Sequence, residues 1–477
     1  MNYIIATPEI FMLSMACIVL LADVYLGQGE KVVYRKLAYW LSLATLVFTF
    51  ILTWKVSPAS SQNAFNGLYV SDGLSDVLKY FIYGISFTVI IYSREYLEER
   101  SLFKGEYFVL ILFAVLGMMI MVSAANFLPM YLGLELLSLA MYALVAMHRE
   151  SREASEAAMK YFVLGAIASG MLLYGMSMIY GATGSLNLTE ISAAVASAQN
   201  DKMLLTFGLV FIVAGIAFKL GVAPFHMWAP DVYQGAPTAI TMFLGTAPKL
   251  AGFALAYRLL VDGLGGLGMD WQQMLTILAV LSIAVGNVIA LSQTNIKRML
   301  AYSTIAHMGY MLLGLIAGTS SGYAASLFYT ITYTIMTAGA FGIVILNSRN
   351  GHEADQLDDL KGLSQRSPWF ALIMLILMFS MAGVPPFVGF WSKWFVLKEV
   401  VAVGHVWLAA VAVFFAIIGA FYYLRIIRLM YFDSVDESVT VTASADLKFT
   451  LSLNGITVLL LGIMPSALLG ICFAVFT

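Results

Sequence analysis

The stretch GIAFKLGVAPF, residues 215–225, places Lys219 and Pro224 inside a long apolar run. Proline removes a backbone donor and clashes with the preceding turn, so a helix through this run should break there. Two further lysines lie in similar apolar stretches, GTAPKLAGFA at 245–254 and VGFWSKWFVL at 388–397. An ionisable group inside a bilayer costs about 2.5–3.5 kcal/mol on insertion scales. These lysines therefore predict a protein that moves ions or protons.

The composition identifies an integral membrane protein. Of the 477 residues, 61% are hydrophobic and only 11% are charged, whereas soluble domains carry about 25% charged residues. The apolar runs are mostly about 20 residues long, as helices across a ~30 Å hydrocarbon core require, and they lack the short alternating segments of a β-barrel. The net charge of −2 indicates no nucleic-acid partner. The first run lacks a signal-peptide pattern, so we expect a retained helix.

Hydropathy predicts about fourteen transmembrane helices. The expected spans are 7–26, 37–54, 76–93, 107–123, 127–147, 155–180, 203–228, 237–258, 271–291, 299–317, 322–346, 369–397, 406–427 and 449–476. Sixteen Lys and Arg residues fall in the loops that follow odd-numbered spans, and four fall in the other loops. By the positive-inside rule the odd loops are cytoplasmic. Both termini should then face away from the cytoplasm.

Two spans share a local signature, GVAPF at 221–225 in span 7 and GVPPF at 383–387 in span 12. Both helices should be broken. The signatures are five spans apart, so they run in opposite directions, as in an inverted-topology repeat. Chance similarity of Gly/Pro-rich membrane segments is the alternative, since Lys219 precedes its break whereas Lys393 follows its break.

The repeat interpretation divides the chain into two units of five helices, spans 4–8 and 9–13. The predicted regions are 1–106 for helices 1–3, 107–260 for the first repeat, 271–430 for the second, inverted repeat, and 449–477 for helix 14. No segment is long enough to form a separate soluble domain.

Six of the ionisable residues within the spans suit a proton relay. They are Glu135, Lys160, Lys219, Lys249, His307 and Lys393. Burial can lower a lysine pKa by up to about 3–5 units, and a nearby carboxylate raises it again, so a lysine whose partner moves can bind and release a proton. Glu135 is the only carboxylate in YLGLELLSLAMY (131–142), and we expect it to form an ion pair with Lys219.

Each candidate also has a structural interpretation. A lysine near a helix end can extend its amine to the membrane interface, which applies to Lys160 and more strongly to Lys79. His307 can be a hydrogen-bonded packing residue. The two cysteines, Cys17 and Cys472, are far apart in apolar runs and cannot supply a metal or iron–sulfur site on their own.

Three segments of the chain resemble a known family. FKLGVAPFHMWAPDVYQGAPTAITMFLGTAPKLAGFA (218–254), together with residues 295–315 and 359–398, is similar to the antiporter-like membrane subunits of respiratory complex I, NADH-quinone oxidoreductase. PDVYQGAPT (230–238) and Lys393, at a site where the M subunits have glutamate, point to the subunit N family. The resemblance spans nearly the whole chain.

The resemblance implies a membrane-arm subunit that translocates protons through Glu135, Lys219, Lys249 and Lys393, with Lys160 and His307 in support. It implies no cofactor in this chain, because NADH, FMN, iron–sulfur clusters and quinone would bind to partner subunits. The expected partners are the antiporter-like subunit M, small helical subunits, protons and the lipid bilayer.

The start of the chain and its span count suggest a bacterial source, hence the inner (plasma) membrane with both termini periplasmic. A ferredoxin-driven photosynthetic relative is the alternative source. The alternative functions are a subunit of a multi-subunit cation/proton antiporter, a secondary transporter of an organic solute, and a passive scaffold. A solute carrier would need a further cluster of polar residues, and a scaffold has no reason to retain lysines at membrane depth.

Overall fold

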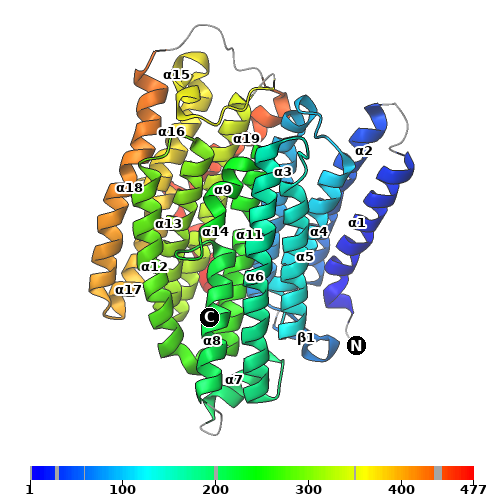
Figure 1. Cartoon of the computed structure of the whole chain (residues 1–477), viewed down its shortest axis with the longest axis vertical. Coiled ribbons are helices and arrows are strands. Elements are labelled where there is room, and N and C mark those ends of the chain that lie inside the picture. The colour runs from blue at the N-terminus through cyan, green and yellow to red at the C-terminus, as the bar shows by residue number, and fades with distance from the viewer. Residues whose placement is uncertain are drawn as a thin grey trace. The chain divides into compact units, whose positions relative to one another are not determined.

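The computed structural model describes residues 3–26, 32–58, 60–197, 202–348, 351–434 and 443–476. In these ranges the chain is helical except for short connections and one two-stranded antiparallel sheet. Figure 1 identifies the elements. The predicted all-α membrane fold is confirmed. The helices belong to two compact units, and each is described by itself.

The first unit comprises residues 1–90, 102–220 and 247–274. Its elements are η1 (Ile4–Ala6), α1 (Thr7–Leu26), α2 (Val32–Val56), β1 (Gln62–Ala64), η2 (Phe65–Gly67), β2 (Tyr69–Ser71), most of α3 (Gly73–Glu99), α4 (Gly105–Val122), α5 (Phe127–Val145), α6 (Arg152–Thr183), α7 (Leu188–Ala196), α8 (Lys202–Leu220), α11 (Ala247–Tyr257), the π-helical η3 (Arg258–Gly263), η4 (Gly265–Leu267) and the start of α12 (Gly268–Ala290).

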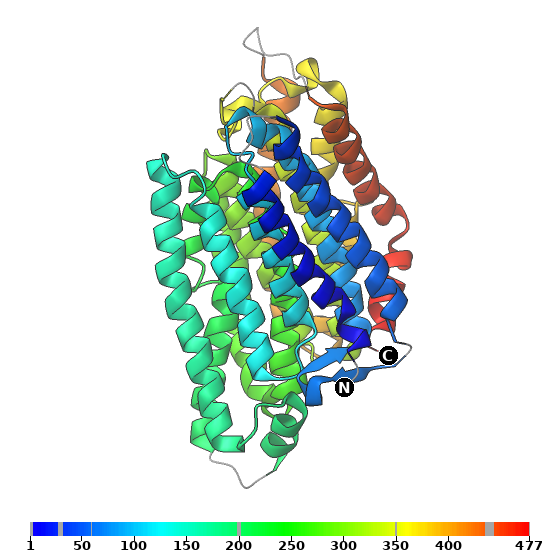
Figure 2. The same cartoon turned by 90° about the vertical axis from the view of Figure 1, so that its right-hand side faces the viewer.

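Close helix packing holds this unit together. Figure 1 shows α6 and α8 side by side, with the short helix α7 at one end. Figure 2 shows α1 and α2 as a pair, with the β1–β2 hairpin at their end. Gly117 of α4 meets α5 so closely that an added Cβ would lie 2.6 Å from the carbonyl oxygen of Gly133. Small residues at such contacts allow membrane helices to approach each other.

The second unit comprises residues 91–101, 221–246 and 275–477. Its elements are the end of α3, α9 (Trp228–Gly235), α10 (Thr238–Gly245), most of α12, α13 (Ile296–Ile316), α14 (Ser320–Asn347), η5 (Leu357–Leu360), α15 (Leu363–Arg366), α16 (Pro368–Ala382), α17 (Val388–Ala402), α18 (Val406–Phe432), α19 (Ala445–Ile463) and α20 (Pro465–Ala474). Helix α14 is its centre, since α10, α13, α16, α17, α19 and α20 all pack against it.

Both predicted helix breaks are present. Helix α8 ends at Leu220 and α16 ends at Ala382, and each is followed by a glycine with a left-handed backbone. The φ angles are +78° at Gly221 and +89° at Gly383. Glycine adopts this conformation without a Cβ penalty, and the prolines that follow prevent the helix from continuing. The sequence prediction for spans 7 and 12 is therefore confirmed.

Other boundaries differ from the predicted spans. Thirteen helices among the described residues are long and apolar enough to cross a membrane, and the broken pair α16 and α17 accounts for a further predicted span. Span 8 is not one continuous helix, because Thr246 interrupts it between α10 and α11 (φ −119°, ψ −96°). Span 14 is interrupted at Met464, where Pro465 starts α20. The domain boundaries and the inverted relation of the two repeats stay predictions.

Candidate functional site

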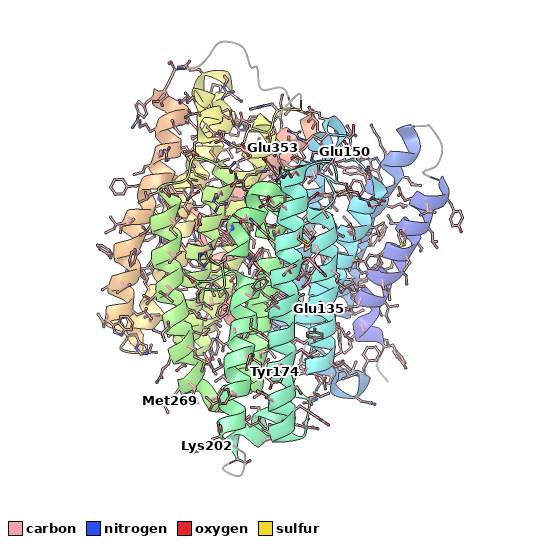
Figure 3. All side chains as sticks on the ribbon, viewed as in Figure 1. Glu135, Glu150, Tyr174, Lys202, Met269 and Glu353 are labelled. Carbon is pink, nitrogen blue, oxygen red and sulfur yellow. The ribbon has the colours of Figure 1, made fainter. Side chains whose placement is uncertain are left out.

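Lys219 is held by a serine rather than by a carboxylate. It lies in the last turn of α8, and its Nζ donates a hydrogen bond of 2.8 Å to Ser138 Oγ on α5. Glu135 lies one helical turn before Ser138, on the same face of α5. Figure 3 shows Glu135 along α5, between Glu150 at one end of the unit and Lys202 at the other.

The direct ion pair between Glu135 and Lys219 is absent from this structure. Among the described residues no carboxylate oxygen lies within 4.0 Å of Lys219 Nζ, and Glu135 Oε1 is buried without a hydrogen-bond partner. The glutamate is still close enough for its charge to act on Lys219. Ser138 therefore lies at the junction of the two charges, a role that nothing in its sequence context signals.

Lys249 binds to the end of the broken helix α8. It follows the interruption at Thr246, and its Nζ donates a 2.9 Å hydrogen bond to the carbonyl oxygen of Leu220, the last residue of α8. The last four carbonyls of a helix have no intrahelical partner, and the C-terminal end of the helix dipole favours a cation. The break next to Lys219 thus creates the acceptor that Lys249 uses.

Lys393 repeats this arrangement in the second unit. Its Nζ donates hydrogen bonds of 3.1 and 2.9 Å to the carbonyl oxygens of Met381 and Ala382, the last two residues of α16. The amine also lies 5.2 Å from the ring centre of Tyr310. Within the described part of the chain no carboxylate lies within ion-pair distance of Lys393. Lys249 and Lys393 thus have the same partner, the end of an interrupted helix.

His307 is hydrogen-bonded through both ring nitrogens. Its Nδ1 is 2.7 Å from Tyr329 Oη, and its Nε2 is 3.0 Å from Tyr423 Oη. Tyr423 Oη is in turn 2.5 Å from Ser303 Oγ. These residues come from α13, α14 and α18, and all are buried. The sequence pointed to His307 but not to the hydroxyl groups, because 25 tyrosines leave no way to choose among them.

Lys160 and Lys79 have carboxylate partners. Lys160 Nζ lies 2.9 Å from Glu156 Oε1, one turn earlier on α6, and its side chain is 42% exposed. Lys79, predicted to reach the interface, is instead buried, and this interpretation was wrong. Its Nζ lies 2.6 Å from Glu9 Oε1 and donates to Tyr69 Oη at 2.9 Å. The hairpin β1–β2 that supplies Tyr69 was not predicted.

Glu353 is a polar centre that sequence analysis missed. It lies in the loop between α14 and α16 and accepts hydrogen bonds from Tyr96, Arg100 and Thr238, with Lys297 Nζ 3.7 Å away. Burial raises the pKa of the Glu353 carboxyl, but Lys297, Arg100 and these hydrogen bonds outweigh it, so the pKa lies below its ordinary value of 4.5.

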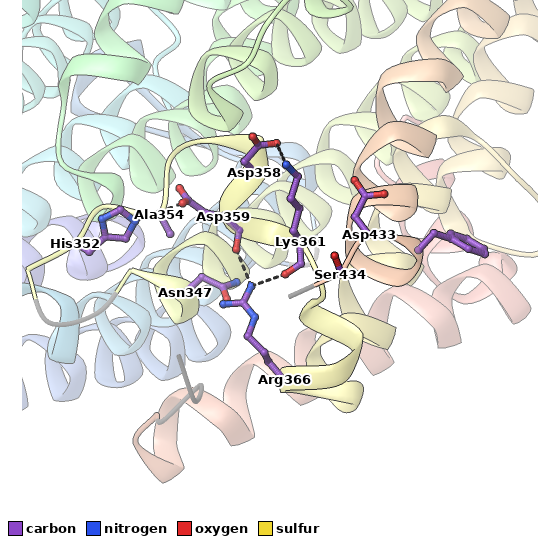
Figure 4. A pocket seen from close by; sticks show the side chains of 10 residues that line it. Asn347, His352, Ala354, Asp358, Asp359, Lys361, Arg366, Asp433 and Ser434 are labelled. Atoms are coloured by element: carbon purple, nitrogen blue, oxygen red, sulfur yellow. Dashed lines mark hydrogen bonds and ion pairs between the residues drawn. The ribbon is translucent and has the colours of Figure 1, made fainter. Parts of the chain in front are cut away.

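The rest of this loop is tied together by short contacts. Lys361 Nζ lies 3.0 Å from Asp358 Oδ1, and Arg366 donates to the carbonyl oxygens of Asp359 and Lys361 at 2.7 and 3.1 Å. These residues line a polar cavity of about 780 Å³ (Figure 4). His352 and Asp433 also line this cavity. Both acidic and basic side chains line it, so it shows no preference for a ligand of one charge.

Arg258 is a second centre that the sequence did not reveal. The predicted span 8 (237–258) ends at this residue, which lies in the π-helical turn after α11 and is buried. Its guanidinium binds Asp72 at 2.7 Å and Asp262 at 3.0 Å. Burial raises the pKa of the Asp72 carboxyl, but Arg258 and the Ser75 hydrogen bonds bring it below its usual value. The cluster fixes the start of α3 against η3.

Comparison with known proteins agrees with this geometry. Residues 124–419 match the model of the NADH:quinone oxidoreductase/Mrp antiporter transmembrane family. The chain is 57% identical over 465 residues to the NADH-quinone oxidoreductase subunit N of Thioalkalivibrio sulfidiphilus (strain HL-EbGR7), which covers 97% of this chain and 96% of the relative.

Solved structures show the same fold. A chain of respiratory complex I from Thermus thermophilus with bound aureothin has a TM-score of 0.83 and 30% identity, covering 97% of this chain and 98% of that one. A chain of the Mrp complex from Dietzia sp. DQ12-45-1b has a TM-score of 0.86 over 100% of this chain and 97% of that one. At 19% identity it shows the fold alone.

Interrupted membrane helices with buried lysines at their ends define an antiporter-like membrane subunit. The chain belongs to the NADH:quinone oxidoreductase/Mrp antiporter family, and the full-length relative described above is a subunit N of NADH-quinone oxidoreductase.

The contact between Ser138 and Lys219 leads to a double-mutant prediction. Ser138→Ala and Lys219→Met remove the same hydrogen bond, so their effects on the free energy of unfolding in detergent should be non-additive by about 1.5–3 kcal/mol. Glu135→Gln combined with Lys219→Met should show a smaller coupling, because the two side chains make no direct contact. Ser42→Ala, which removes a buried serine hydroxyl of the same unit on α2, a helix that packs against α1 and α4, is the control and should be additive with Lys219→Met. Additivity of Ser138→Ala would contradict the contact.

The lowered pKa of Glu353 predicts how stability depends on pH. The ionised carboxylate contributes stability in full above pH 4.5, and the contribution is lost as the pH falls through the lowered folded pKa. Glu353→Gln should therefore lower the melting temperature at pH 7, and the difference from the wild type should shrink in acid. Thermal unfolding across this range measures it. Glu150→Gln, at an exposed position, is the control and should leave the melting temperature unchanged at pH 7 and in acid. A difference between Glu353→Gln and the wild type that persists in acid would refute the stabilising role of the ionised Glu353 carboxylate.

Proposed function

We propose that this chain translocates protons as a membrane-arm subunit of NADH:quinone oxidoreductase, through a relay of buried Glu, Lys and His residues that is coupled to quinone reduction in other subunits. The observation that carries the proposal is that Lys249 and Lys393 each bind the carbonyl end of an interrupted helix. Carbonyl groups orient an amine without neutralising its charge. For Lys393, which has no carboxylate within ion-pair distance among the described residues, a buried charge is costly, and an amine that gives up its proton avoids that cost.

The proposed relay groups form one cluster in each unit. In the first unit the proton-binding groups are Glu135, Lys219 and Lys249. Ser138 binds Lys219 and lies one turn from Glu135, and Lys249 binds the carbonyl oxygen of Leu220, the residue after Lys219. In the second unit they are His307 and Lys393. Movement of Lys219 from Ser138 toward Glu135 would let the carboxylate stabilise the protonated amine. Movement of Lys219 back to Ser138 would lower the proton affinity of the amine. Lys160, with its exposed partner Glu156, suits proton exchange with the surface.

The redox chemistry is assigned to partner subunits. We assign NADH, FMN, iron–sulfur clusters and quinone to them, and we expect the subunit M and small helical subunits as neighbours in the membrane. Among the described residues no group of three His, Cys, Asp or Glu side chains could hold a metal ion. The likeness to NADH-quinone oxidoreductase subunit N supports this assignment over the cation/proton antiporter alternative.

Lys249 provides the direct test of the relay. Lys249→Ala should lower NADH-driven proton pumping by about tenfold or more while the complex still assembles, because general acid–base groups contribute at least that much. Lys249→Arg should also impair pumping, since arginine effectively never deprotonates. A pH-sensitive dye in sealed vesicles measures the rate. Lys202→Ala, at an exposed lysine, is the control. Normal pumping by both Lys249 variants would exclude the relay, and pumping that requires sodium or potassium ions would favour the antiporter.

The orientation in a bacterial inner membrane is part of the proposal. The cationic loops predict that both termini are periplasmic, although Met1 and Thr477 themselves lie outside the described residues. Tags fused to either end should react with an impermeant reagent added to whole cells with a permeabilised outer membrane. A tag on a cytoplasmic loop, for example after Arg149, should react only in inverted vesicles. Labelling of a terminus only in inverted vesicles would reverse the assignment.

A further inference from the structure

His307 is the centre of a chain of groups that can each donate and accept a hydrogen bond. The order is Ser303, Tyr423, His307 and Tyr329, with successive distances of 2.5, 3.0 and 2.7 Å. Ser303 and His307 are one helical turn apart on α13, and the tyrosines reach them from α18 and α14. The exposed fraction is at most 3% for all four residues. The chain therefore connects three helices away from the surface.

The two tyrosines must have opposite roles at any moment. A neutral imidazole has one N–H donor and one acceptor nitrogen. If Nδ1 carries the hydrogen, it donates to Tyr329, and Nε2 accepts from Tyr423, which in turn accepts from Ser303. In the other tautomer every hydrogen bond points the opposite way. The whole chain thus has two directions, and passing one proton along it converts one direction into the other.

Nearby hydroxyl groups lack this property. Tyr310 donates to the carbonyl oxygen of Ala412, and Thr304 donates to the carbonyl oxygen of Leu300; a carbonyl cannot pass a proton on. The Ser303 hydroxyl bonds to Tyr423, whereas the adjacent Tyr422 hydroxyl, which also lies beside Ser303 and Tyr423, donates to Asn287 Oδ1 at 3.3 Å. Ser303, Tyr423, His307 and Tyr329 thus form a sequence of amphoteric groups that does not end at a carbonyl.

We infer that Ser303, Tyr423, His307 and Tyr329 form a proton wire, and that the hydroxyl groups of Tyr329 and Tyr423 are relay groups of the second unit. This inference rests on the proposed proton translocation. In one passage, Nε2 takes the hydroxyl proton of Tyr423 while Tyr423 takes one from Ser303. At the same time Ser303 takes a proton from a protonated water molecule at its end of the wire, and Nδ1 gives its proton to Tyr329, whose own hydroxyl proton passes to a water molecule at the other end. One proton enters and one leaves, so each O–H or N–H bond that breaks is replaced by one that forms, and the four groups stay neutral.

Tyrosine-to-phenylalanine variants of the assembled complex test the wire. Tyr329→Phe and Tyr423→Phe each remove one hydroxyl and keep the ring, so the pumping rate per assembled complex should fall at least fivefold. Tyr333→Phe is the matched control, because Tyr333 is equally buried one turn after Tyr329 and its hydroxyl donates to Thr304 at 2.7 Å, not to His307. It should keep more than half of the rate. Equal rates in all three variants would overturn the wire.

Two further measurements separate a relay role from a structural one. A fluorinated tyrosine at position 329 keeps the hydroxyl and should restore pumping to within twofold of the wild type. If a phenylalanine variant does not assemble, Ser303→Ala is measured instead. It removes only the end of the wire and should lower the pumping rate about threefold. An unchanged pumping rate in Ser303→Ala would refute the wire. Lys249→Ala is measured in parallel. Impaired pumping there, with normal rates in the tyrosine variants, rejects the wire alone, whereas normal pumping in Lys249→Ala rejects the proposed function itself.

Discussion

An interrupted helix inside a bilayer leaves backbone carbonyls that must find a hydrogen-bond donor, because lipid supplies none. In this chain the donors are lysines. The carbonyl oxygens at the ends of α8 and α16 accept from Lys249 and Lys393. Glycine and proline create the breaks, the breaks create the acceptors, and the acceptors hold two cations at defined places. A continuous helix at either position would remove the acceptor and leave a buried amine without its partner.

The buried cations fall into two groups that differ in their partners. Lys79 and Arg258 have carboxylates at 2.6–3.0 Å. Removing one partner of such a pair strands a charge and is strongly destabilising, which suits groups that keep one protonation state and fix helices. Lys219 and Lys393 instead bind a hydroxyl group or carbonyl groups. Such partners accept from an ammonium or from a neutral amine, so loss of a proton does not break the arrangement. Geometry thus separates structural cations from candidate carriers.

The sequence was sufficient for the parts of the fold that depend on local chemistry. Hydropathy located the spans, and the Gly-Val-x-Pro signatures located the breaks after Leu220 and Ala382. The interruption at Thr246 was missed, because Pro248 lies where proline is tolerated in the first turn of a helix. Contacts between distant segments could not be predicted. Ser138 binds Lys219, which lies 81 residues away in the sequence, and the partners of Glu353 lie between 56 and 257 residues away. The pattern of a single sequence does not show which distant residues come into contact.

Charged groups and hydroxyl groups have different roles in proton transport through a low-dielectric interior, because the former can hold a proton and the latter can pass one on. A lysine or glutamate can hold a proton as a localised charge, which is costly away from water and sensitive to its neighbours. A chain of hydroxyl and imidazole groups holds no net charge, so it can cross the apolar centre of α13, α14 and α18 without an ion-pair partner. It is also selective, because sodium or potassium ions cannot hop between such groups. A unit that places Lys393 beside Tyr310, with the Tyr310 ring stacked on Tyr329, therefore brings a proposed proton-storing group close to the proposed proton wire.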